Sequence, residues 1–415
     1  MKIYIVFPGP LYPISGMSQI RMVSQLTSLI RKGHQVVFSD LLSRPDSLRM
    51  AEEKLSGMNI KYEPVYLYRY GKGKILNIID SILRRLLYEL KTISRQELAV
   101  STKPVIKQIL QIANANGVEA LMLHYWHLGK LFSLLDKVTL RIMDTHYLVE
   151  EHVELMAEGK YNEHGYKAFK HKRELLYSLH KQRSYFQEAD LVVVNSEKQQ
   201  RLIHSWDERI PVNVTVNGQD LTRFLNYTAN NPQEPAVCFY GALSNQFNRR
   251  ALKLILAKIL PLIITSIPEV RLYVIGANPP LDILDHNGND SVMVTGYVED
   301  VRPYLGKCKV LLLPLETGSG FRGRTVEVMA MGIPIVGTNN ALQSVGFIDG
   351  ELGYIEETAE GIAQRTVELL KDASVWQSMA ANCRTFAAQR FTLEATFDKL
   401  AEYLDKMGEP CRVRD

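Results

Sequence analysis

The residues best suited to phosphate chemistry lie in one glycine-rich segment. Glycines let a diphosphate approach the backbone closely, free N–H groups at the start of a helix attract an anion, and arginines supply paired hydrogen bonds to phosphate oxygens. All three occur in Gly318-Ser319-Gly320-Phe321-Arg322-Gly323-Arg324-Thr325-Val326-Glu327. We expect a helix over residues 325–332, with Glu327 one turn inside it. A carboxylate only accepts hydrogen bonds, so it suits the two hydroxyls of a ribose; the alternative is a glutamate that only complements the helix dipole.

Strands and helices must position this segment, and the pattern of apolar residues predicts both. Residues 2–7 are an apolar run of strand length, followed by a Pro/Gly turn, an amphipathic helix ending near Gly33, and a second strand at 35–38. This is the strand–helix–strand order of a parallel sheet. Further runs follow at 120–123, 140–143 and 191–194 and, after residue 210, at 214–216, 236–240, 271–275, 292–294, 310–313 and 333–336.

These runs predict an α/β chain of two Rossmann-like, doubly wound domains facing a cleft. We expect the first domain over residues 1–210, the second over 211–390, and a final helix in 391–415 that returns toward the first domain. Residues 217–235, rich in Asn, Pro and Thr, are the expected linker. A length of 415 residues fits two domains, and 46% apolar with 23% charged residues excludes a disordered or fibrous chain.

The cysteines predict the compartment. Cys238, Cys308, Cys383 and Cys411 are far apart, with no CxxC or Cys/His spacing. We therefore expect free thiols, and neither a metal site nor a disulfide framework. The apolar run at 3–7 is too short for a signal peptide or a spanning helix. The sequence thus predicts a protein of the reducing cytoplasm.

Positive charge is concentrated in the first half. The first 200 residues carry 28 Lys/Arg and 20 Asp/Glu, whereas the whole chain has a net charge of +4. This predicts either an anionic partner, such as lipid headgroups or a phosphate-bearing acceptor, or merely solvated lysines. Residues 74–93 place apolar residues at helical spacing among basic ones, which fits peripheral contact with the inner face of an anionic membrane or a core-facing helix. Residues 160–183 mix cations with tyrosines but match no binding module, so we expect no nucleic-acid partner.

Several short strings resemble the glycosyltransferase family 4 pattern and occur in that family's order over nearly the whole chain. In the first half they are Arg31-Lys32-Gly33-His34-Gln35-Val36 and Ala189-Asp190-Leu191-Val192-Val193-Val194-Asn195-Ser196. In the second half they are Asn217-Gly218-Gln219-Asp220, Phe239-Tyr240-Gly241, Val274-Ile275-Gly276, Gly296-Tyr297-Val298-Glu299-Asp300 and residues 314–332. The resemblance implies the GT-B fold, a nucleotide-sugar donor on the second domain, an acceptor mainly on the first, no metal or other cofactor, and retention of anomeric configuration.

His146 is the residue that matches the family's active-site histidine. The string Arg141-Ile142-Met143-Asp144-Thr145-His146-Tyr147 resembles the strand end that carries it. At the carboxyl edge of a parallel strand an imidazole would face the cleft, where it can hydrogen-bond sugar hydroxyls or the departing phosphate. A histidine that only packs is the alternative. The neighbouring run His124-Tyr125-Trp126-His127 is either a set of acceptor contacts, because aromatic faces stack on sugar rings, or a packed loop.

The expected donor site departs from the family at two positions. Ser319 stands where the first of two glutamates is usual, and we expect its hydroxyl to bond sugar hydroxyls or phosphate during catalysis. Leu243 stands where an arginine is usual, so Arg322 and Arg324 become the expected diphosphate ligands. The residues expected to bind the donor are Gly16, Gly241, Gly276, Val298, Gly318, Gly320, Phe321, Arg322, Arg324, Thr325 and Glu327.

The resemblance, together with these residues, implies a retaining glycosyltransferase of the hexosyltransferase type. It would move a sugar from a nucleoside diphosphate sugar to a hydroxyl of a glycan, lipid-linked or small-molecule acceptor, in bacterial glycan, exopolysaccharide or glycolipid synthesis. Two alternatives stay open. One is a nucleotide-sugar epimerase of the same fold. The other is a non-catalytic sugar-nucleotide-binding subunit, which the departures at Ser319 and Leu243 motivate.

Overall fold

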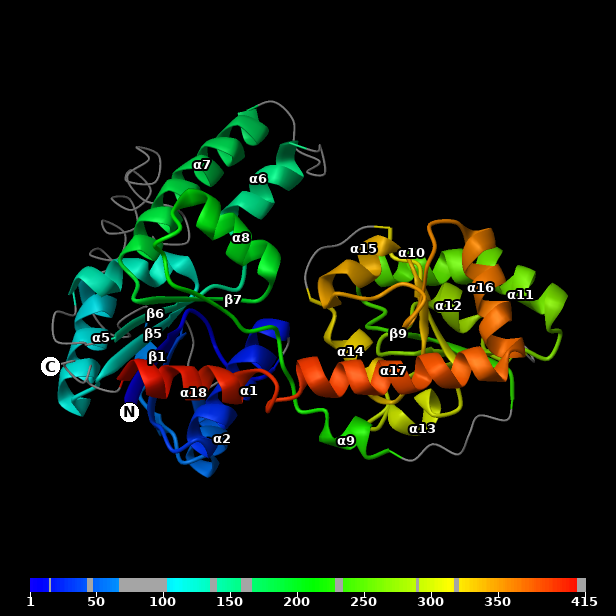
Figure 1. The fold of residues 1–415 in the computed structure, drawn as a ribbon, viewed down its shortest axis with the longest axis horizontal. Helices are drawn as coiled ribbons and strands as arrows, with labels where there is room; N and C mark the ends of the chain where they lie inside the picture. The colour runs from blue at the N-terminus through cyan, green and yellow to red at the C-terminus, as the bar shows by residue number, and fades with distance from the viewer. Residues whose placement is uncertain are drawn as a thin grey trace, which may run out of the picture. The chain divides into compact units, whose positions relative to one another are not determined.

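The chain forms two compact units, each with its own parallel sheet (Figure 1). Unit 1 comprises Met1–Gly218 and Thr396–Asp415, and unit 2 comprises Gln219–Ala395. The structure, a computed structural model, describes residues 1–14, 16–42, 48–66, 103–134, 140–157, 166–227, 234–288, 291–316 and 321–408.

The sheet of unit 1 has the strand order β3-β2-β1-β5-β6-β7-β8, with β4 paired to β2. Strands β2 and β3 follow on one side of β1, and strands β5 to β8 follow on its other side. The strand order therefore reverses between β1 and β5. The strands are Lys2–Phe7 (β1), Gln35–Leu42 (β2), Lys61–Tyr62 (β3), Val65–Tyr66 (β4), Ala120–His124 (β5), Leu140–Asp144 (β6), Leu191–Val194 (β7) and Val212–Val214 (β8). The helices are Met17–Arg31 (α1), Leu48–Gly57 (α2), Lys103–Asn116 (α5), Trp126–Leu134 (η2), Val149–Ala157 (α6), Tyr166–Gln187 (α7), Glu197–Trp206 (α8) and Phe397–Gly408 (α18).

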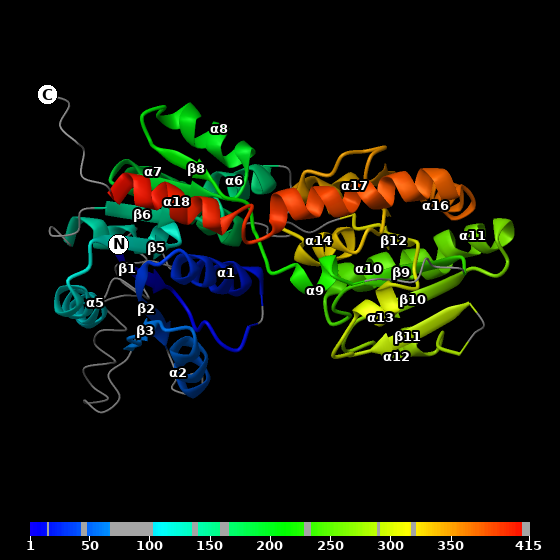
Figure 2. The ribbon, with the colours of Figure 1, turned by 60° about the horizontal axis from the view of Figure 1, so that its bottom comes forward.

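The apolar runs form the strands because helices cover the sheet on its faces. β5 and β7 are buried along their whole length, which explains sequences without a polar alternation. Helix α18 returns to unit 1 and packs along α1, as Figure 2 shows. Two ion pairs join the helices. Arg31 Nη2 lies 2.6 Å from Asp398 Oδ2, and Lys32 Nζ lies 2.6 Å from Glu402 Oε1.

The sheet of unit 2 has the order β11-β10-β9-β12-β13-β14, and its order reverses between β9 and β12. The strands are Ala236–Tyr240 (β9), Arg271–Ile275 (β10), Val292–Gly296 (β11), Val310–Leu313 (β12), Ile335–Gly337 (β13) and Gly353–Ile355 (β14). The helices are Thr222–Leu225 (α9), Gln246–Leu254 (α10), Ile255–Ile259 (η3), Leu260–Ser266 (α11), Leu281–Leu284 (α12), Arg302–Leu305 (α13), Gly323–Ala330 (α14), Asn339–Leu342 (α15), Gln343–Val345 (η4), Ala359–Lys371 (α16) and Ala373–Phe391 (α17).

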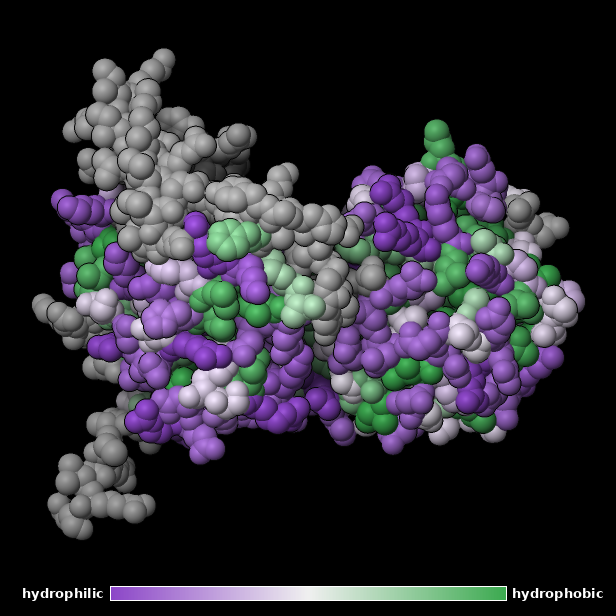
Figure 3. Space-filling model, turned by 90° about the horizontal axis from the view of Figure 1, so that it is seen from above, coloured by the Kyte–Doolittle hydropathy of each residue, from purple (hydrophilic) through white to green (hydrophobic). Residues whose placement is uncertain are grey.

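Local sequence signals set where the helices of unit 2 begin. The side chains of Asn245, Thr358 and Asp372 each accept a hydrogen bond from a backbone N–H in the first turn of α10, α16 and α17. The face of unit 2 drawn in Figure 3 is largely polar, with apolar groups scattered among the polar ones. The buried apolar residues of unit 2 include nearly all of β9, β10 and β12.

The prediction of an α/β fold with two Rossmann-like sheets is confirmed. The prediction that residues 214–216 open the second sheet is wrong, because Val212–Val214 is β8 and pairs with β7 in unit 1. This strand satisfies the backbone groups that would otherwise be left free along the edge of β7. The expected helix at 325–332 begins two residues earlier, at Gly323. Residues 74–93 lie outside the described residues, and none of the described helices is both long and apolar enough to cross a membrane.

We expect Gly353→Ala to destabilise unit 2. Gly353 has φ of +137°, and a Cβ there would lie 2.0 Å from the backbone oxygen of Ile335 on the paired strand. Strain and clash together should lower the free energy of unfolding by about 1–3 kcal/mol, measured by urea denaturation. Gly57→Ala is the matched control, because Gly57 has no atom within 4 Å of its Cβ position. Equal stability of the Gly353→Ala variant and the wild type would contradict this account of the β13–β14 pairing.

Candidate functional site

In unit 2, two glycines bring the loops after β9 and β10 into direct backbone contact. A Cβ on Gly276 would lie 1.8 Å from the backbone oxygen of Gly241. The loops are joined by hydrogen bonds from Gly241 N to Ile275 O (3.0 Å) and from Leu243 N to Ala277 O (3.0 Å). Both loops stand at carboxyl ends of parallel strands, where α/β proteins bind ligands. The close packing explains why both positions are glycine, because a side chain on either would clash with the protein.

Glu327 lies beside this edge. The hydroxyl of Tyr240, the last residue of β9, donates to Glu327 Oε2 at 3.0 Å. The Arg324 guanidinium carbon lies 5.1 Å from the centre of the Tyr240 ring. Burial raises the pKa of Glu327, while the Tyr240 hydroxyl and Arg324 act in the opposite direction. Glu327 is thus a half-buried hydrogen-bond acceptor of α14, held by Tyr240 at the end of β9.

Gln219, the first residue of unit 2, holds the start of helix α14, which carries Glu327. Gln219 Nε2 donates to Gly323 O at 3.0 Å, and Gln219 N donates to Phe391 O at 2.9 Å. Phe321 packs near Phe391, with ring centres 5.7 Å apart. The string around Gln219 therefore positions the start of α14, a role that its sequence alone did not indicate.

The structure brings some of the expected donor residues together and leaves others apart. Arg324 is exposed and Arg322 half-buried, and burial lowers the pKa of Arg322. Thr325 is buried, with 3% of its surface exposed, so its side chain faces the protein. Val298 is half-buried in the loop after β11, and Gly16 belongs to unit 1, at the start of α1. Gly318, Ser319 and Gly320 lie outside the described residues.

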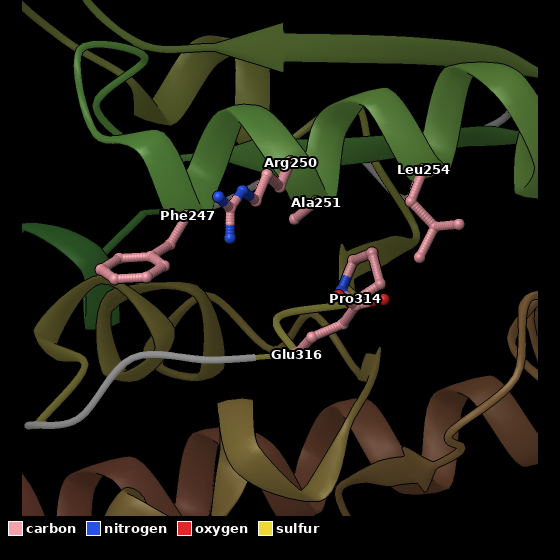
Figure 4. A pocket seen from close by; sticks show the side chains of 6 residues that line it. All are labelled: Phe247, Arg250, Ala251, Leu254, Pro314 and Glu316. Carbon is pink, nitrogen blue, oxygen red and sulfur yellow. The ribbon is translucent and has the colours of Figure 1, made fainter. Parts of the chain in front are cut away.

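A pocket occupies the point where the sheet order of unit 2 reverses. It is lined by Phe247, Arg250, Ala251 and Leu254 of α10 and by Pro314 and Glu316, which follow β12 (Figure 4). Arg250 and Glu316 bring opposite charges to this one pocket. Sequence reasoning gave neither residue a main role; the signal that could have found them is that β9 and β12 flank the reversal. Leu243, at the family's arginine position, is fully buried.

In unit 1, His146 lies where the sheet order reverses. Its Nε2 is 3.0 Å from His124 Nδ1, and its ring stacks on Tyr125 with centres 4.2 Å apart and planes 4° apart. Phe7, the last residue of β1, meets the His146 ring edge-on at 6.4 Å. Tyr125 has φ of +72°, a conformation that costs an aromatic residue energy. The carboxyl ends of β1, β5 and β6 therefore converge on His146.

The other aromatic residues of this region are packed. Trp126 is fully buried and His127 is 8% exposed, so of the two interpretations for residues 124–127 the packed loop fits these side chains. Burial lowers the pKa of His127 to about 4. Burial also lowers the pKa of His124 to about 4, with Asp144 opposing the shift and Arg21 adding to it.

Asp144, the last residue of β6, is the buried charge beside these histidines. Arg21 of α1 contacts both of its carboxylate oxygens, with Nη2 at 3.0 and 3.1 Å, and Gln25 Nε2 donates to Oδ2 at 3.0 Å. Burial alone would raise the pKa of Asp144, but Arg21, followed by the two histidines, lowers it. Desolvation, reinforced by Arg21, holds the pKa of His146 well below its usual value despite Asp144. The imidazole is therefore neutral at pH 7.

Among the described residues, His124, Asp144 and His146 form a group that could hold a metal ion, with donor atoms within 4.8 Å of one another. The chemistry of the group argues against one. Arg21 already occupies both oxygens of Asp144, so a cation would meet a guanidinium at contact distance. The arrangement suits a neutral imidazole that donates or accepts a hydrogen bond.

A family model of known proteins matches most of unit 2. Residues 234–372 match the family model described as glycosyl transferases group 1, a stretch that runs from β9 through α14 to α16. Most of unit 2 is therefore similar to the group 1 glycosyl transferases. Glu327, Tyr240 and the Gly241–Gly276 contact all lie inside the matched stretch.

Two curated relatives match the chain at 25% identity. One is the capsular polysaccharide biosynthesis glycosyltransferase CapM of Staphylococcus aureus, over 142 residues, which are 32% of this chain and 37% of that protein. The other is 2-deoxystreptamine N-acetyl-D-glucosaminyltransferase of Niallia circulans, over 135 residues, 30% of this chain and 34% of that protein. The chain thus spans about a third of the length of these relatives.

Solved structures resemble the whole chain in fold. Sucrose-phosphate synthase from Thermosynechococcus elongatus matches with a TM-score of 0.65 at 16% identity, covering 98% of both chains. HepE of Anabaena, in complex with UDP and glucose, matches with a TM-score of 0.60 at 14% identity, covering 98% of this chain and 100% of that one. At these identities the likeness shows the fold, which agrees with two Rossmann-like domains.

Protonation of the buried histidines should destabilise unit 1 in acid. His124 and His127 have pKa values of about 4 when folded, against 6.5 ordinarily, so below about pH 6.5 the unfolded chain binds protons that the folded chain does not. Stability is then fully present above that pH and falls toward pH 4, by about 1.4 kcal/mol per pH unit for each histidine. Urea denaturation at pH 7.5, 6 and 5 measures this slope. His127→Gln should reduce it, whereas a wild-type stability that does not change between pH 7 and 5 would contradict the burial argument.

Proposed function

We propose that this protein is a retaining glycosyltransferase of the hexosyltransferase type, which moves a sugar from a nucleoside diphosphate sugar to an acceptor hydroxyl. The observation that carries the proposal is the Tyr240–Glu327 hydrogen bond beside the close Gly241–Gly276 backbone contact, inside the stretch that matches the group 1 glycosyl transferases. Glu327 would accept the ribose hydroxyls, and Arg322 and Arg324 would hold the diphosphate. The pathway would be bacterial glycan, exopolysaccharide or glycolipid synthesis.

In the transfer step that we propose, the acceptor oxygen bonds to the anomeric carbon while the bond from that carbon to the diphosphate oxygen breaks. Both occur on the same face of the sugar, so configuration is retained. The departing diphosphate takes the proton of the acceptor hydroxyl, and its charge is held by the arginines and by the N–H groups at the start of α14. His146 is neutral and lies where the sheet order of unit 1 reverses, and in this scheme it would hydrogen-bond the reacting groups. No metal or other cofactor enters this scheme.

The names of similar proteins supply the first ligands to try. HepE was solved with UDP and glucose, and CapM is named for capsular polysaccharide synthesis. We therefore propose a uridine nucleotide sugar as donor and a glycan, lipid-linked or small-molecule acceptor. Neither the epimerase nor the non-catalytic subunit is favoured by these comparisons. Peripheral contact with an anionic membrane remains a prediction resting on residues 74–93, outside the described residues.

Replacing Glu327 should weaken nucleotide binding without unfolding unit 2. Glu327→Ala removes ribose hydrogen bonds to a charged acceptor, worth about 1.5–3 kcal/mol, or tenfold and more in Kd. Calorimetry with UDP, GDP and ADP measures the loss. Glu360→Ala is the matched control, since Glu360 is an exposed glutamate in the first turn of α16 that only complements a helix dipole. If both variants bind nucleotide as tightly as the wild type, the assignment of Glu327 is wrong.

Replacing His146 should affect turnover rather than donor binding, because His146 belongs to unit 1 and the nucleotide site to unit 2. We expect His146→Ala to lower kcat by about a hundredfold, with the Kd for UDP within twofold of wild type. His127→Ala is the control, because His127 is buried in the neighbouring loop. An inactive His127→Ala together with a normal His146→Ala would show that the catalytic histidine has been placed on the wrong strand end.

A further inference from the structure

One buried side chain, Arg21, contacts three segments of unit 1 that are far apart in sequence. Its Nε and Nη2 donate to Asp144, and its Nη1 donates to Thr215 O and to Asn217 Oδ1, both at 2.9 Å. Its guanidinium carbon lies 5.2 Å from the centre of the Phe397 ring. Only 1% of its side chain is exposed. Every polar face of the guanidinium is thus engaged.

Two of these three segments are the connectors by which the chain passes between the units. We call residues 215–219 the first connector and residues 391–397 the second, since the units divide after Gly218 and after Ala395. The connectors touch each other. A Cβ on Gly218 would lie 1.9 Å from Thr396 Oγ1, and Gln219 N donates to Phe391 O at 2.9 Å. A displacement of one connector therefore affects the other.

The third segment carries His146. Asp144 ends β6, and Tyr125 N donates to Asp144 O at 2.9 Å while the Tyr125 ring stacks on His146. Asn195 Nδ2 holds the backbone oxygen of His146 at 3.1 Å. The carboxylate of Asp144 has Arg21 and Gln25 as its partners. The side chain of Asp144, two residues before His146, is thus held by Arg21 and Gln25.

We propose that Arg21 is a positioning residue that couples the geometry of the His146 segment to both connectors. A guanidinium is a rigid planar fork, so it cannot follow Asn217 or Phe397 without changing its bonds to Asp144. Separation is costly as well, because it leaves a buried charge without its partner. Shifts of the connectors are therefore transmitted to His146. The consequence for turnover rests on the proposed function; the coupling itself does not.

The coupling is tested without any substrate. Protein labelled with ¹⁵N-histidine gives the imidazole signals of His146, assigned by their loss in His146→Gln. Asn217→Ala and Phe397→Leu alter the connectors without replacing Asp144 or His146. We expect both substitutions to shift the His146 imidazole signals. Arg31→Ala is the matched control, because Arg31 lies on the same helix and its Nη2 donates to Asp398 Oδ2 of α18 at 2.6 Å. His146 signals that stay at wild-type positions in Asn217→Ala and Phe397→Leu would overturn the proposal.

A kinetic arm tests the consequence for transfer. Arg21→Lys keeps the charge but cannot span Asp144, Thr215 and Asn217 together, so kcat should fall about threefold or more while the Kd for UDP stays within twofold. Asn217→Ala acts through Arg21, so the double variant should lose no more than Arg21→Lys alone. Additive losses would overturn the proposal. If the wild type turns over no nucleotide sugar, the proposed function fails, and the histidine signals still decide the coupling.

Discussion

The ion pair between Arg21 and Asp144 is the interaction on which unit 1 depends most. Both side chains are withdrawn from water, and removing either would leave the other charge buried and unpaired, at a cost of about 3–5 kcal/mol. Arg21 keeps the pKa of Asp144 low, and it adds to the desolvation that lowers the pKa of the neighbouring imidazoles. It also joins α1 to β6, to the chain after β8 and to α18. A single charge pair thus lies beside His146 and is hydrogen-bonded to the segment by which the chain leaves the unit.

In unit 2 the proposed site depends on backbone contacts rather than on a buried ion pair. Its strand ends at Gly241 and Gly276 carry no side chains, and the acceptor group is supplied from α14, whose start is held by Gln219. Glu327 is held by the Tyr240 hydroxyl instead of by a buried cation, which leaves it free to exchange that bond for a ligand hydroxyl. The two proposed roles follow from these environments: the nucleotide site that we propose rests on closely packed backbone, and the neutral histidine lies beside a compensated charge.

Much of the fold could be predicted because apolar runs such as 191–194 and 310–313 have the length and composition of buried parallel strands. Glu327 could be proposed from the sequence because glycines, arginines and a helix start stand in one short segment. Arg21 could not, since it is 123 residues from Asp144 in sequence and a lone arginine on an amphipathic helix is expected to face water. The strand at 212–214 was assigned to the wrong sheet, because periodicity shows that a strand exists and not which edge it joins.

The central claim, that the nucleotide site lies on unit 2 at the carboxyl ends of β9 and β10 with Glu327 as its acceptor, is tested most directly by hydrogen exchange. Backbone exchange of the whole chain is measured by mass spectrometry with and without a saturating nucleoside diphosphate from the UDP, GDP and ADP panel. The account predicts new protection in residues 240–243, 275–277 and 321–327. Protection that is absent from these loops, or that falls on the strand ends of unit 1 instead, would contradict it.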